Sequence, residues 1–284
     1  MKVLAFGEHW GAVAPAGFEL VAEPVADVVA VLTLPAFPVD RAVIEALPKL
    51  RVIGTPTVGY DHVDIDAADE RSVAVVSVPD YCTEEVADHT LALLYGLVRG
   101  IVELDRQVVR GRWDARGAGP LHTLAELRIG IVGLGRIGGA VATRLLALGC
   151  DVWANDVLPV TRDGVRFVSL DELVAECDAV TVHVPLTSDT RGLIGRREIE
   201  SMRPEGLLVN TSRGAVVDLG AVLVALRTGR LAGAALDVLP REPPAVAPLA
   251  PNLIVTPHAA YYSEAAEERA YRLCVARVRE VLGV

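Results

Sequence analysis

A glycine-rich turn at residues 133–138 (GLGRIG) joins an apolar run at 128–132 to a segment at 139–148 whose apolar residues recur at helical spacing. A second apolar run at 151–155 is followed by Asp156, 18 positions after Gly138. The order of strand, glycines, helix, strand and acidic residue is typical of a dinucleotide-binding βαβ unit. A tight turn that binds no ligand is the alternative interpretation of the glycines taken alone.

Each glycine of this turn has its own physical role in such a unit. Gly133 permits the tight turn, Gly135 lets the backbone approach a pyrophosphate, and Gly138 lets the helix pack closely on the strand. The helix N-terminus offers unpaired N–H groups and a positive dipole end to an anion. Asp156 would accept hydrogen bonds from the adenosine ribose and repel a 2′-phosphate, so the sequence predicts NAD rather than NADP as cofactor.

The composition indicates covered sheets and argues against several classes of partner. The chain has 284 residues, of which 52% are hydrophobic, but no apolar run is long enough to cross a bilayer and no leader sequence is recognisable. The four cysteines lack metal-like spacing, so we expect reduced thiols, no metal site and a cytoplasmic location. The formal net charge of −10 disfavours binding to nucleic acid or to an anionic membrane.

Apolar strand-like runs alternate with helical segments along almost the whole chain, which favours an α/β fold with parallel sheets. Strands are expected at 2–6, 27–33, 51–55, 73–78, 128–132, 151–155, 179–184, 207–210, 234–238 and 253–256. Helices are expected at 40–47, 84–99, 139–148, 170–176, 219–228 and 263–282, with Asp40 and Thr83 as candidate N-caps.

Two such strand series predict two doubly wound parallel-sheet domains with a cleft between them. The last helix has no strand series after it, so we expect it to return to the N-terminal unit. The dinucleotide-binding domain, of Rossmann type, would span 82–263. The smaller flavodoxin-like substrate domain would be discontinuous and would combine 1–81 with 264–284.

Three polar clusters follow strands of the second series, at the sheet edge where open α/β sheets bind ligands. They are 209–214 (VNTSRG), 237–244 (DVLPREPP) and 256–260 (TPHAA). An arginine after a strand, here Arg213, can bind a carboxylate with its planar guanidinium group. His258 held by a carboxylate such as Glu242 would make a general acid/base. Taken one at a time, Arg213 could instead form a surface ion pair, His258 could cap a strand, and Glu242 could be a solvated loop charge.

On these residues the chain resembles the NAD-dependent D-2-hydroxyacid dehydrogenases over nearly its full length. The glycine turn, the cluster at 210–214, the segment 237–243 and the Pro257-His258 pair occur in the order of the family's signatures, and Glu242 lies 29 positions after Arg213, as is typical of the family. Residues 58–64 (VGYDHVD) are similar to the family's substrate-carboxylate loop. Within the family, 256–264 (TPHAAYYSE) is most similar to the C-terminal-binding-protein-like branch.

The resemblance implies roles for individual residues. Arg213 would orient and polarise the substrate, His258 would exchange the proton of the C2 oxygen, and Glu242 would hold His258. Other residues implied to bind the substrate, a small anionic 2-hydroxyacid or 2-oxoacid, are Val58, Gly59 and Tyr261. The cofactor-binding residues are expected to be Thr90, Gly133, Gly135, Arg136, Ile137, Gly138, Asp156, His183, Val184, Pro185, Thr211, Ser212, Asp237 and His258. The segment 84–121 resembles the helix and arm with which the family forms a homodimer.

Two other functions remain open at this stage. The chain could be an NAD(H)-sensing interaction scaffold like the corepressors that share this fold, since those proteins retain the same catalytic residues. It could also be a biosynthetic dehydrogenase that acts on an unusual hydroxyacid, such as one bearing a phosphonate. Arg112, Arg116 and Arg241 could then bind the second anionic group, although solvated surface charges are the commoner role of loop arginines.

Overall fold

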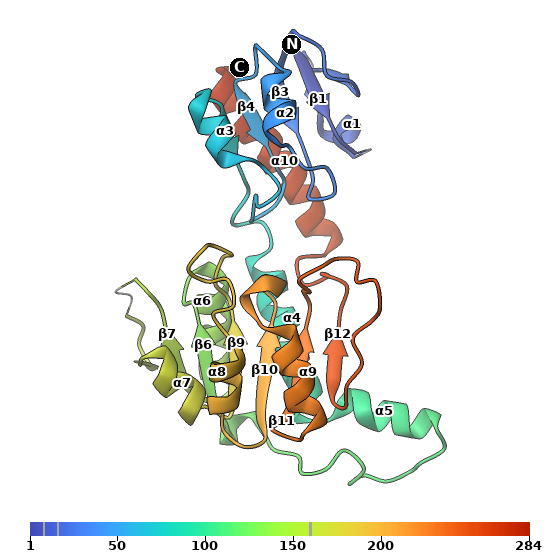
Figure 1. The fold of residues 1–284 in the computed structure, drawn as a ribbon, viewed down its shortest axis with the longest axis vertical. Coiled ribbons are helices and arrows are strands. Elements are labelled where there is room, and N and C mark those ends of the chain that lie inside the picture. Colours follow the sequence, from blue (N-terminus) through green and yellow to red (C-terminus); the bar gives the residue numbers. More distant parts are fainter. Residues whose placement is uncertain (8, 16, 159–160) are drawn as a thin grey trace. The chain divides into compact units, whose positions relative to one another are not determined.

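The computed structural model describes residues 1–7, 9–15, 17–158 and 161–284. The chain divides into two compact units, which are described separately below. The first unit comprises Met1–Cys82 and Tyr262–Val284, and the second comprises Thr83–Tyr261. Each unit is built on one parallel sheet, which confirms the predicted fold class (Figure 1).

The sheet of the first unit has the strand order β2-β1-β3-β4-β5, and all of its described pairings are parallel. This is the flavodoxin-like order. Its strands are β1 (Lys2–Ala5), β2 (Glu19–Val21), β3 (Val28–Leu32), β4 (Val52–Gly54) and β5 (Ala74–Val76). The helices from this part of the chain are α1 (Trp10–Val13), α2 (Arg41–Glu45) and α3 (Ile65–Glu70).

The last helix, α10 (Glu264–Leu282), packs against β4 and β5 of the first unit. Gly54 on β4 permits this contact, because a Cβ atom there would lie 2.6 Å from Val278 Cγ2 and 3.0 Å from Cys274 Sγ. Ser263 caps the helix by accepting a hydrogen bond from the Ala266 N–H at 3.0 Å. The polypeptide therefore returns to its N-terminal sheet after residues 83–261 have formed the second unit.

The sheet of the second unit has the strand order β12-β11-β10-β9-β6-β7-β8, and its described pairings are also parallel. Renumbered from β6, this is the Rossmann order, in which the direction of winding changes between β6 and β9. The strands are β6 (Arg128–Val132), β7 (Asp151–Asn155), β8 (Val165–Phe167), β9 (Ala179–Val182), β10 (Gly206–Asn210), β11 (Leu231–Leu236) and β12 (Leu253–Val255).

Helices cover both faces of this sheet, which explains why its strands are apolar throughout. Ile129 and Ile131 pack with α4 (Thr83–Val98) and α6 (Arg136–Ala147) on one face. Val180 and Val182 pack on the other face with α7 (Leu170–Glu176), α8 (Arg196–Ser201) and α9 (Leu219–Arg227). The remaining helices are α5 (Ile101–Val109) and the 3₁₀ turns η1 (Leu124–Glu126) and η2 (Gly214–Val216).

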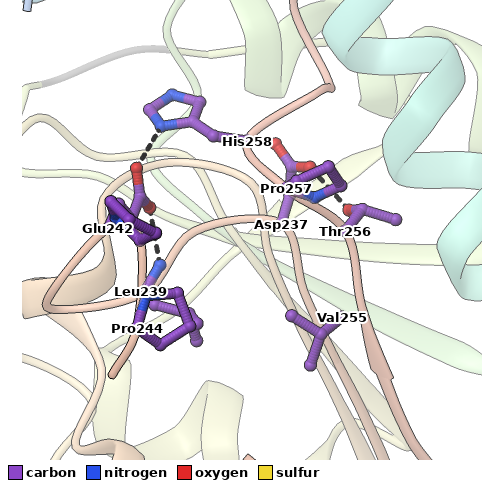
Figure 2. A pocket seen from close by; sticks show the side chains of 9 residues that line it. Asp237, Leu239, Glu242, Pro244, Val255, Thr256, Pro257 and His258 are labelled. Atoms are coloured by element: carbon purple, nitrogen blue, oxygen red, sulfur yellow. Dashed lines mark hydrogen bonds and ion pairs between the residues drawn. The ribbon is translucent and has the colours of Figure 1, made fainter. Parts of the chain in front are cut away.

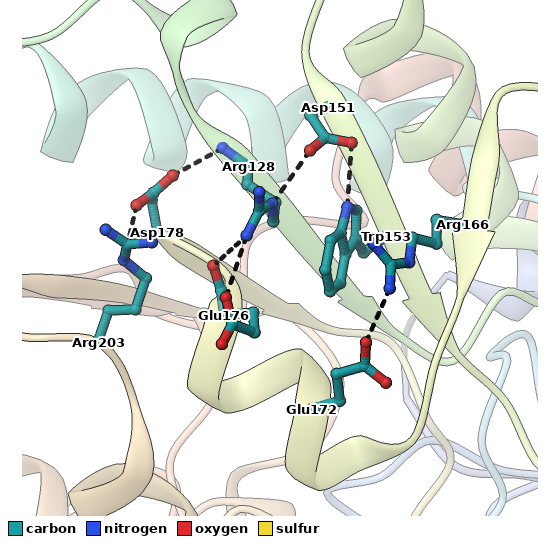
Figure 3. A network of polar contacts seen from close by, with 8 residues as sticks. All are labelled: Arg128, Asp151, Trp153, Arg166, Glu172, Glu176, Asp178 and Arg203. Atoms are coloured by element: carbon teal, nitrogen blue, oxygen red, sulfur yellow. Dashed lines mark hydrogen bonds and ion pairs between the residues drawn. The ribbon is translucent and has the colours of Figure 1, made fainter.

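An aromatic side chain between two guanidinium groups links three neighbouring strands of the second unit (Figure 3). The Cζ atoms of Arg128 on β6 and Arg166 on β8 lie 4.4 and 4.1 Å from the ring centroid of Trp153 on β7. Asp151 accepts hydrogen bonds from Arg128 Nε and Trp153 Nε1, both at 3.0 Å. Cation–π contacts of this kind contribute about 0.5–2 kcal/mol each. This network links β6, β7 and β8 in the part of the sheet that contains the βαβ unit.

Several expected elements differ from those observed. Asp40 caps α2 as predicted, by accepting from the Val43 N–H at 3.0 Å. Thr83 is not an N-cap, because α4 already includes it. The predicted strand 234–238 ends two residues too late, since β11 ends at Leu236 and Asp237 belongs to a loop. Among the described residues, no helix is long and apolar enough to cross a membrane.

Candidate active site

The glycine turn connects β6 to α6 at the change in winding direction, and each glycine has a distinct environment. Gly133 has φ +91°, and a Cβ atom there would lie 2.8 Å from Val184 Cγ1. A Cβ atom at Gly138 would overlap the Gly133 carbonyl oxygen and lie 3.0 Å from its carbon. At Gly135 no heavy atom of the described residues lies within 4 Å of the Cβ position, so this side of the turn is open among them. Arg136 and Ile137 follow as the first residues of α6. The open space beside a helix N-terminus fits the pyrophosphate of a dinucleotide.

Asp156 follows β7 and is tied directly to the glycine turn. Its carboxylate accepts hydrogen bonds from the Leu134 N–H at 2.7 Å and the Leu158 N–H at 2.8 Å. Each carboxylate oxygen has further acceptor capacity, and the residue is half-buried. The position therefore agrees with an acidic group beside an adenosine ribose, and the bond to Leu134 fixes its orientation.

The segment His183-Val184-Pro185 follows β9, on the other side of the change in winding direction. The His183 N–H donates to the Val132 carbonyl at 2.8 Å, and Val184 lies against Gly133. Burial lowers the pKa of His183 to about 4, so the ring is neutral at physiological pH. Its Nε2 atom has no hydrogen-bond partner among the described residues.

The loop between β10 and Arg213 is shaped by buried hydroxyl and amide groups. Thr90 donates its only hydroxyl proton to the Val86 carbonyl at 2.8 Å. In the 2.9 Å contact between Thr90 and Thr211 the Thr211 hydroxyl must therefore be the donor. Asn210 accepts from the Ser212 N–H at 3.0 Å and donates to the Arg213 carbonyl at 3.0 Å. The sequence did not identify Asn210 as the residue that fixes this turn.

His258 and Glu242 form the predicted pair (Figure 2). His258 Nδ1 lies 2.7 Å from Glu242 Oε2, and Glu242 Oε1 accepts from the Leu239 N–H at 2.7 Å. Burial by itself raises the pKa of the Glu242 carboxyl. The hydrogen bonds from His258 and Leu239 and the charges of His258 and Arg213 outweigh this effect and hold the pKa below its ordinary value of 4.5. Glu242 is consequently an ionised acceptor at the Nδ1 atom of His258.

Asp237 has a structural role that the sequence did not reveal. It is 1% exposed and follows β11, and its carboxylate accepts from the Thr256 hydroxyl at 2.5 Å. The same carboxylate accepts from the Ala259 N–H at 2.8 Å and the Ala260 N–H at 3.0 Å. Its carbonyl oxygen accepts from the His258 N–H at 2.8 Å. Asp237 thus holds the backbone on both sides of His258.

Arg213 and Tyr261 complete the group of predicted residues that lie in the second unit. Gly214 follows Arg213, and a Cβ atom at this glycine would overlap the backbone of Leu239, so the arginine loop packs directly on the loop that carries Glu242. Arg213 Nη1 donates to the Ser212 carbonyl at 2.8 Å. The Tyr261 ring lies edge-on to His258 with 6.1 Å between ring centroids. A pocket of about 330 Å³ is lined by residues from 237–244 and 255–258.

The two other predicted substrate residues, Val58 and Gly59, belong to the first unit and follow β4. Hydroxyl groups fix this loop: Thr55 and Thr57 share a hydrogen bond at 2.8 Å, and Thr57 donates to the Gly59 carbonyl at 2.6 Å. The backbone of the loop is therefore held in one conformation within its own unit.

Comparison with known proteins identifies the family. Residues 91–260 match the sequence profile of "D-isomer specific 2-hydroxyacid dehydrogenase, NAD binding domain". The chain is 39% identical over 276 residues to the glyoxylate reductase of Korarchaeum cryptofilum, covering 92% of this chain and 81% of that protein. It is 37% identical over 239 residues to the glycerate dehydrogenase of Methylorubrum extorquens, covering 81% of this chain and 75% of that protein.

A solved structure of similar fold is the D-lactate dehydrogenase of Aquifex aeolicus complexed with NAD and lactic acid. Its TM-score is 0.89 at 27% sequence identity, and the alignment covers 100% of this chain and 96% of that one. The fold, the open glycine turn and the match over most of the second unit agree with one another. The chain belongs to the D-isomer specific 2-hydroxyacid dehydrogenases, a family of NAD-dependent oxidoreductases.

Proposed function

We propose that the protein interconverts a small D-2-hydroxyacid and its 2-oxoacid. NAD, when bound, supplies or accepts the hydride. The observation that supports this proposal most strongly is the 2.7 Å contact between His258 and an ionised Glu242 beside the Arg213 loop. A histidine oriented by a carboxylate is suited to move a proton to and from the C2 oxygen.

In the proposed reaction, neutral His258 accepts the hydroxyl proton during oxidation and the imidazolium returns it during reduction. Glu242 stabilises the imidazolium and fixes the tautomer, because it accepts a hydrogen bond from the Nδ1–H group and leaves Nε2 for the substrate. Arg213 binds the carboxylate and polarises the carbonyl with a planar fork of donors. The developing negative charge on oxygen would be met by both cationic groups.

We propose that the cofactor is held by the residues around the change in winding direction. The open side of Gly135 would receive the pyrophosphate, and Asp156 would accept from the ribose hydroxyls. Equal or better kcat/KM with NADPH than with NADH would contradict the role of Asp156. The other cofactor contacts expected from the family resemblance are those of Thr90, Gly133, Arg136, Ile137, Gly138, His183, Val184, Pro185, Thr211, Ser212, Asp237 and His258.

We propose that the substrate also meets the backbone of Val58 and Gly59 and the ring of Tyr261. Accordingly, 1–81 with 264–284 would act as the substrate domain and 82–263 as the dinucleotide-binding domain. The resemblance of 256–264 to the C-terminal-binding-protein-like branch supports placing the chain near that branch. A cytoplasmic location is supported by the four cysteines, all of which are buried thiols.

We propose a homodimer that forms through the segment 84–121. Four apolar side chains in this segment are exposed in the single chain: Ile101 at 55%, Val108 at 50%, Val109 at 80% and Trp113 at 91%. Burial of such a group against a second copy would remove apolar surface from water. Val109→Glu should shift the mass measured by light scattering towards that of a monomer. Val246→Glu, at another exposed valine (81%), is the matched control.

The experiment that tests the proposed activity is a reductase screen that follows the loss of NADH absorbance. The relatives' names make glyoxylate, hydroxypyruvate and pyruvate the first 2-oxoacids to try. A phosphonate-bearing 2-oxoacid should be included, because Arg112, Arg116 and Arg241 are all exposed. Turnover of at least one 2-oxoacid is expected. NADH binding without turnover of any of them would contradict the proposal and favour the interaction-scaffold alternative.

A further inference from the structure

His89, on α4, reaches the loop that carries His258. Its Nε2 atom lies 3.1 Å from Thr256 Oγ1 and 3.5 Å from Asp237 Oδ1. The side chain is 25% exposed, whereas that of Asp237 is fully buried. The resemblance to the family assigned no role to His89, and its contacts with Thr256 and Asp237 are not part of the proposed proton transfer.

The direction of these hydrogen bonds follows from counting protons. Thr256 has one hydroxyl proton, and the 2.5 Å bond to Asp237 Oδ1 uses it. Thr256 Oγ1 can therefore only accept from His89, so the Nε2 atom of His89 carries a proton. Two hydrogen bonds therefore run in series, from His89 to Thr256 and from Thr256 to the Asp237 carboxylate. Hydrogen bonds in such a series strengthen one another.

The backbone conformation of His258 depends on Asp237, the last acceptor in this series of hydrogen bonds. His258 has φ +54°, a left-handed conformation that is uncommon outside glycine and needs support from the surrounding structure. That support consists of the His258 N–H bond to the Asp237 carbonyl and the Ala259 and Ala260 N–H bonds to the Asp237 carboxylate. If the carboxylate turns, the backbone that aims the His258 ring at its target turns with it.

We propose that His89 is a positioning residue for the reaction: by donating to Thr256 it fixes the Asp237 carboxylate, and thereby holds His258 in its left-handed, substrate-facing conformation. This inference rests on the proposed function, in which His258 is the proton carrier. His89 is not placed in contact with substrate or cofactor. Helix α4 also supports the arginine loop through the neighbouring Thr90–Thr211 contact, so one helix holds both loops.

The test compares His89→Leu, His89→Gln and Thr256→Val with the wild type. Leu removes the donor, whereas Gln keeps an N–H at a similar reach. The loss of one hydrogen bond of this kind should change kcat by about three- to tenfold. We expect His89→Leu to lower kcat for 2-oxoacid reduction by this factor and His89→Gln to restore most of the rate. His122→Leu, at an exposed histidine, is the matched control and should keep the wild-type kcat.

Amide NMR supplies a readout that does not depend on activity. The Ala259 and Ala260 N–H resonances should move in His89→Leu and stay near their wild-type positions in His89→Gln. If His89→Leu does not fold, Thr256→Val should show the same fall in kcat and the same amide shifts. When both single variants fold, the double variant should lose no more activity than either one.

An unchanged kcat and unchanged amide resonances in His89→Leu would overturn the inference. Equal losses in His89→Leu and His89→Gln would also overturn it, because the donated hydrogen bond would then not be the cause. A wild-type protein that reduces no 2-oxoacid would contradict the proposed function instead. In that case the amide shifts would still decide whether His89 holds the loop.

Discussion

Two alanine substitutions in the glycine turn should have opposite effects, because the two Cβ positions have opposite surroundings. At Gly135 no heavy atom in the described part of the chain lies within 4 Å of the new methyl group, and the backbone angles of φ −68° and ψ −154° are extended. Gly135→Ala should therefore leave the free energy of unfolding unchanged or raise it by up to about 1 kcal/mol. The new methyl group would point into the space proposed for the pyrophosphate.

At Gly138 the same methyl group has no space. It would overlap the Gly133 carbonyl oxygen and lie 3.2 Å from Ile131 Cγ2, so backbone must move. Overpacking of this kind costs about 1–3 kcal/mol, and each kcal/mol lowers Tm by roughly 2–4 °C in a protein of this size class. Gly138→Ala should thus melt several degrees below the wild type even without cofactor.

The assays are thermal unfolding without ligand and a fluorescence titration with NADH. For Gly135→Ala we expect a Tm close to that of the wild type and a dissociation constant raised about tenfold or more, since about 1.4 kcal/mol of lost contact is tenfold in affinity. Gly11→Ala, where no heavy atom of the described residues lies within 4 Å of the Cβ position, is the control and should leave the dissociation constant for NADH unchanged. The reasoning is refuted if Gly135→Ala binds NADH as tightly as the wild type, or if Gly138→Ala is as stable.

Three further substitutions test the catalytic groups. Glu242 has a lowered pKa, so its charge is complete above the ordinary carboxyl pKa of 4.5 and is lost only as the pH falls through the lower folded value. Glu242→Gln removes that charge and leaves the imidazolium of His258 less stable. As the pH is raised, kcat for reduction should therefore begin to decline at a lower pH than in the wild type. An unshifted pH profile would contradict the proposed role of Glu242. Arg213→Lys keeps the charge but loses the planar fork, and we expect kcat to fall and KM to rise for every 2-oxoacid; unchanged kinetics would mean that the carboxylate is bound elsewhere. Tyr261→Ala should change the ratios of kcat/KM between 2-oxoacids with different side chains, by an amount equivalent to about 1–3 kcal/mol, while the affinity for NADH stays constant. A uniform fall in kcat/KM together with a lower Tm would show that the ring is structural.

Sequence periodicity predicted every described strand except β2 and β8, and it missed the helices α1, α3, α5 and α8. β6, β7 and β9 are buried on both faces and appear as continuous apolar runs. β2 and β8 have three residues each, none of them fully buried, so they leave no such pattern. The four residues of α1 are likewise too few to show a helical period.

In the site, the residues that the sequence identified are those whose chemistry belongs to a motif. The contacts that orient these residues depend on the folded backbone and could not be predicted from motifs. Asp237 was expected among the cofactor-binding residues, a role that stays a proposal, but its bonds to Ala259 and Ala260 accompany a left-handed backbone at His258 (φ +54°) that no sequence pattern indicated. His89 lies 167 positions from Thr256, and a histidine in an apolar helix gave no sign of that contact.

The most direct test of the central claim follows the hydride itself. Deuterium placed on the transferring position at C4 of NADH should appear at C2 of a hydroxyacid of D configuration, detected by mass spectrometry and chiral chromatography after reduction of the best 2-oxoacid that carries a carbon side chain, such as hydroxypyruvate or pyruvate. The same transfer in His258→Gln should be slower by roughly 10² or more, while NADH binding changes little. Deuterium that does not reach C2, a product of L configuration, or a wild-type rate in His258→Gln would contradict the account.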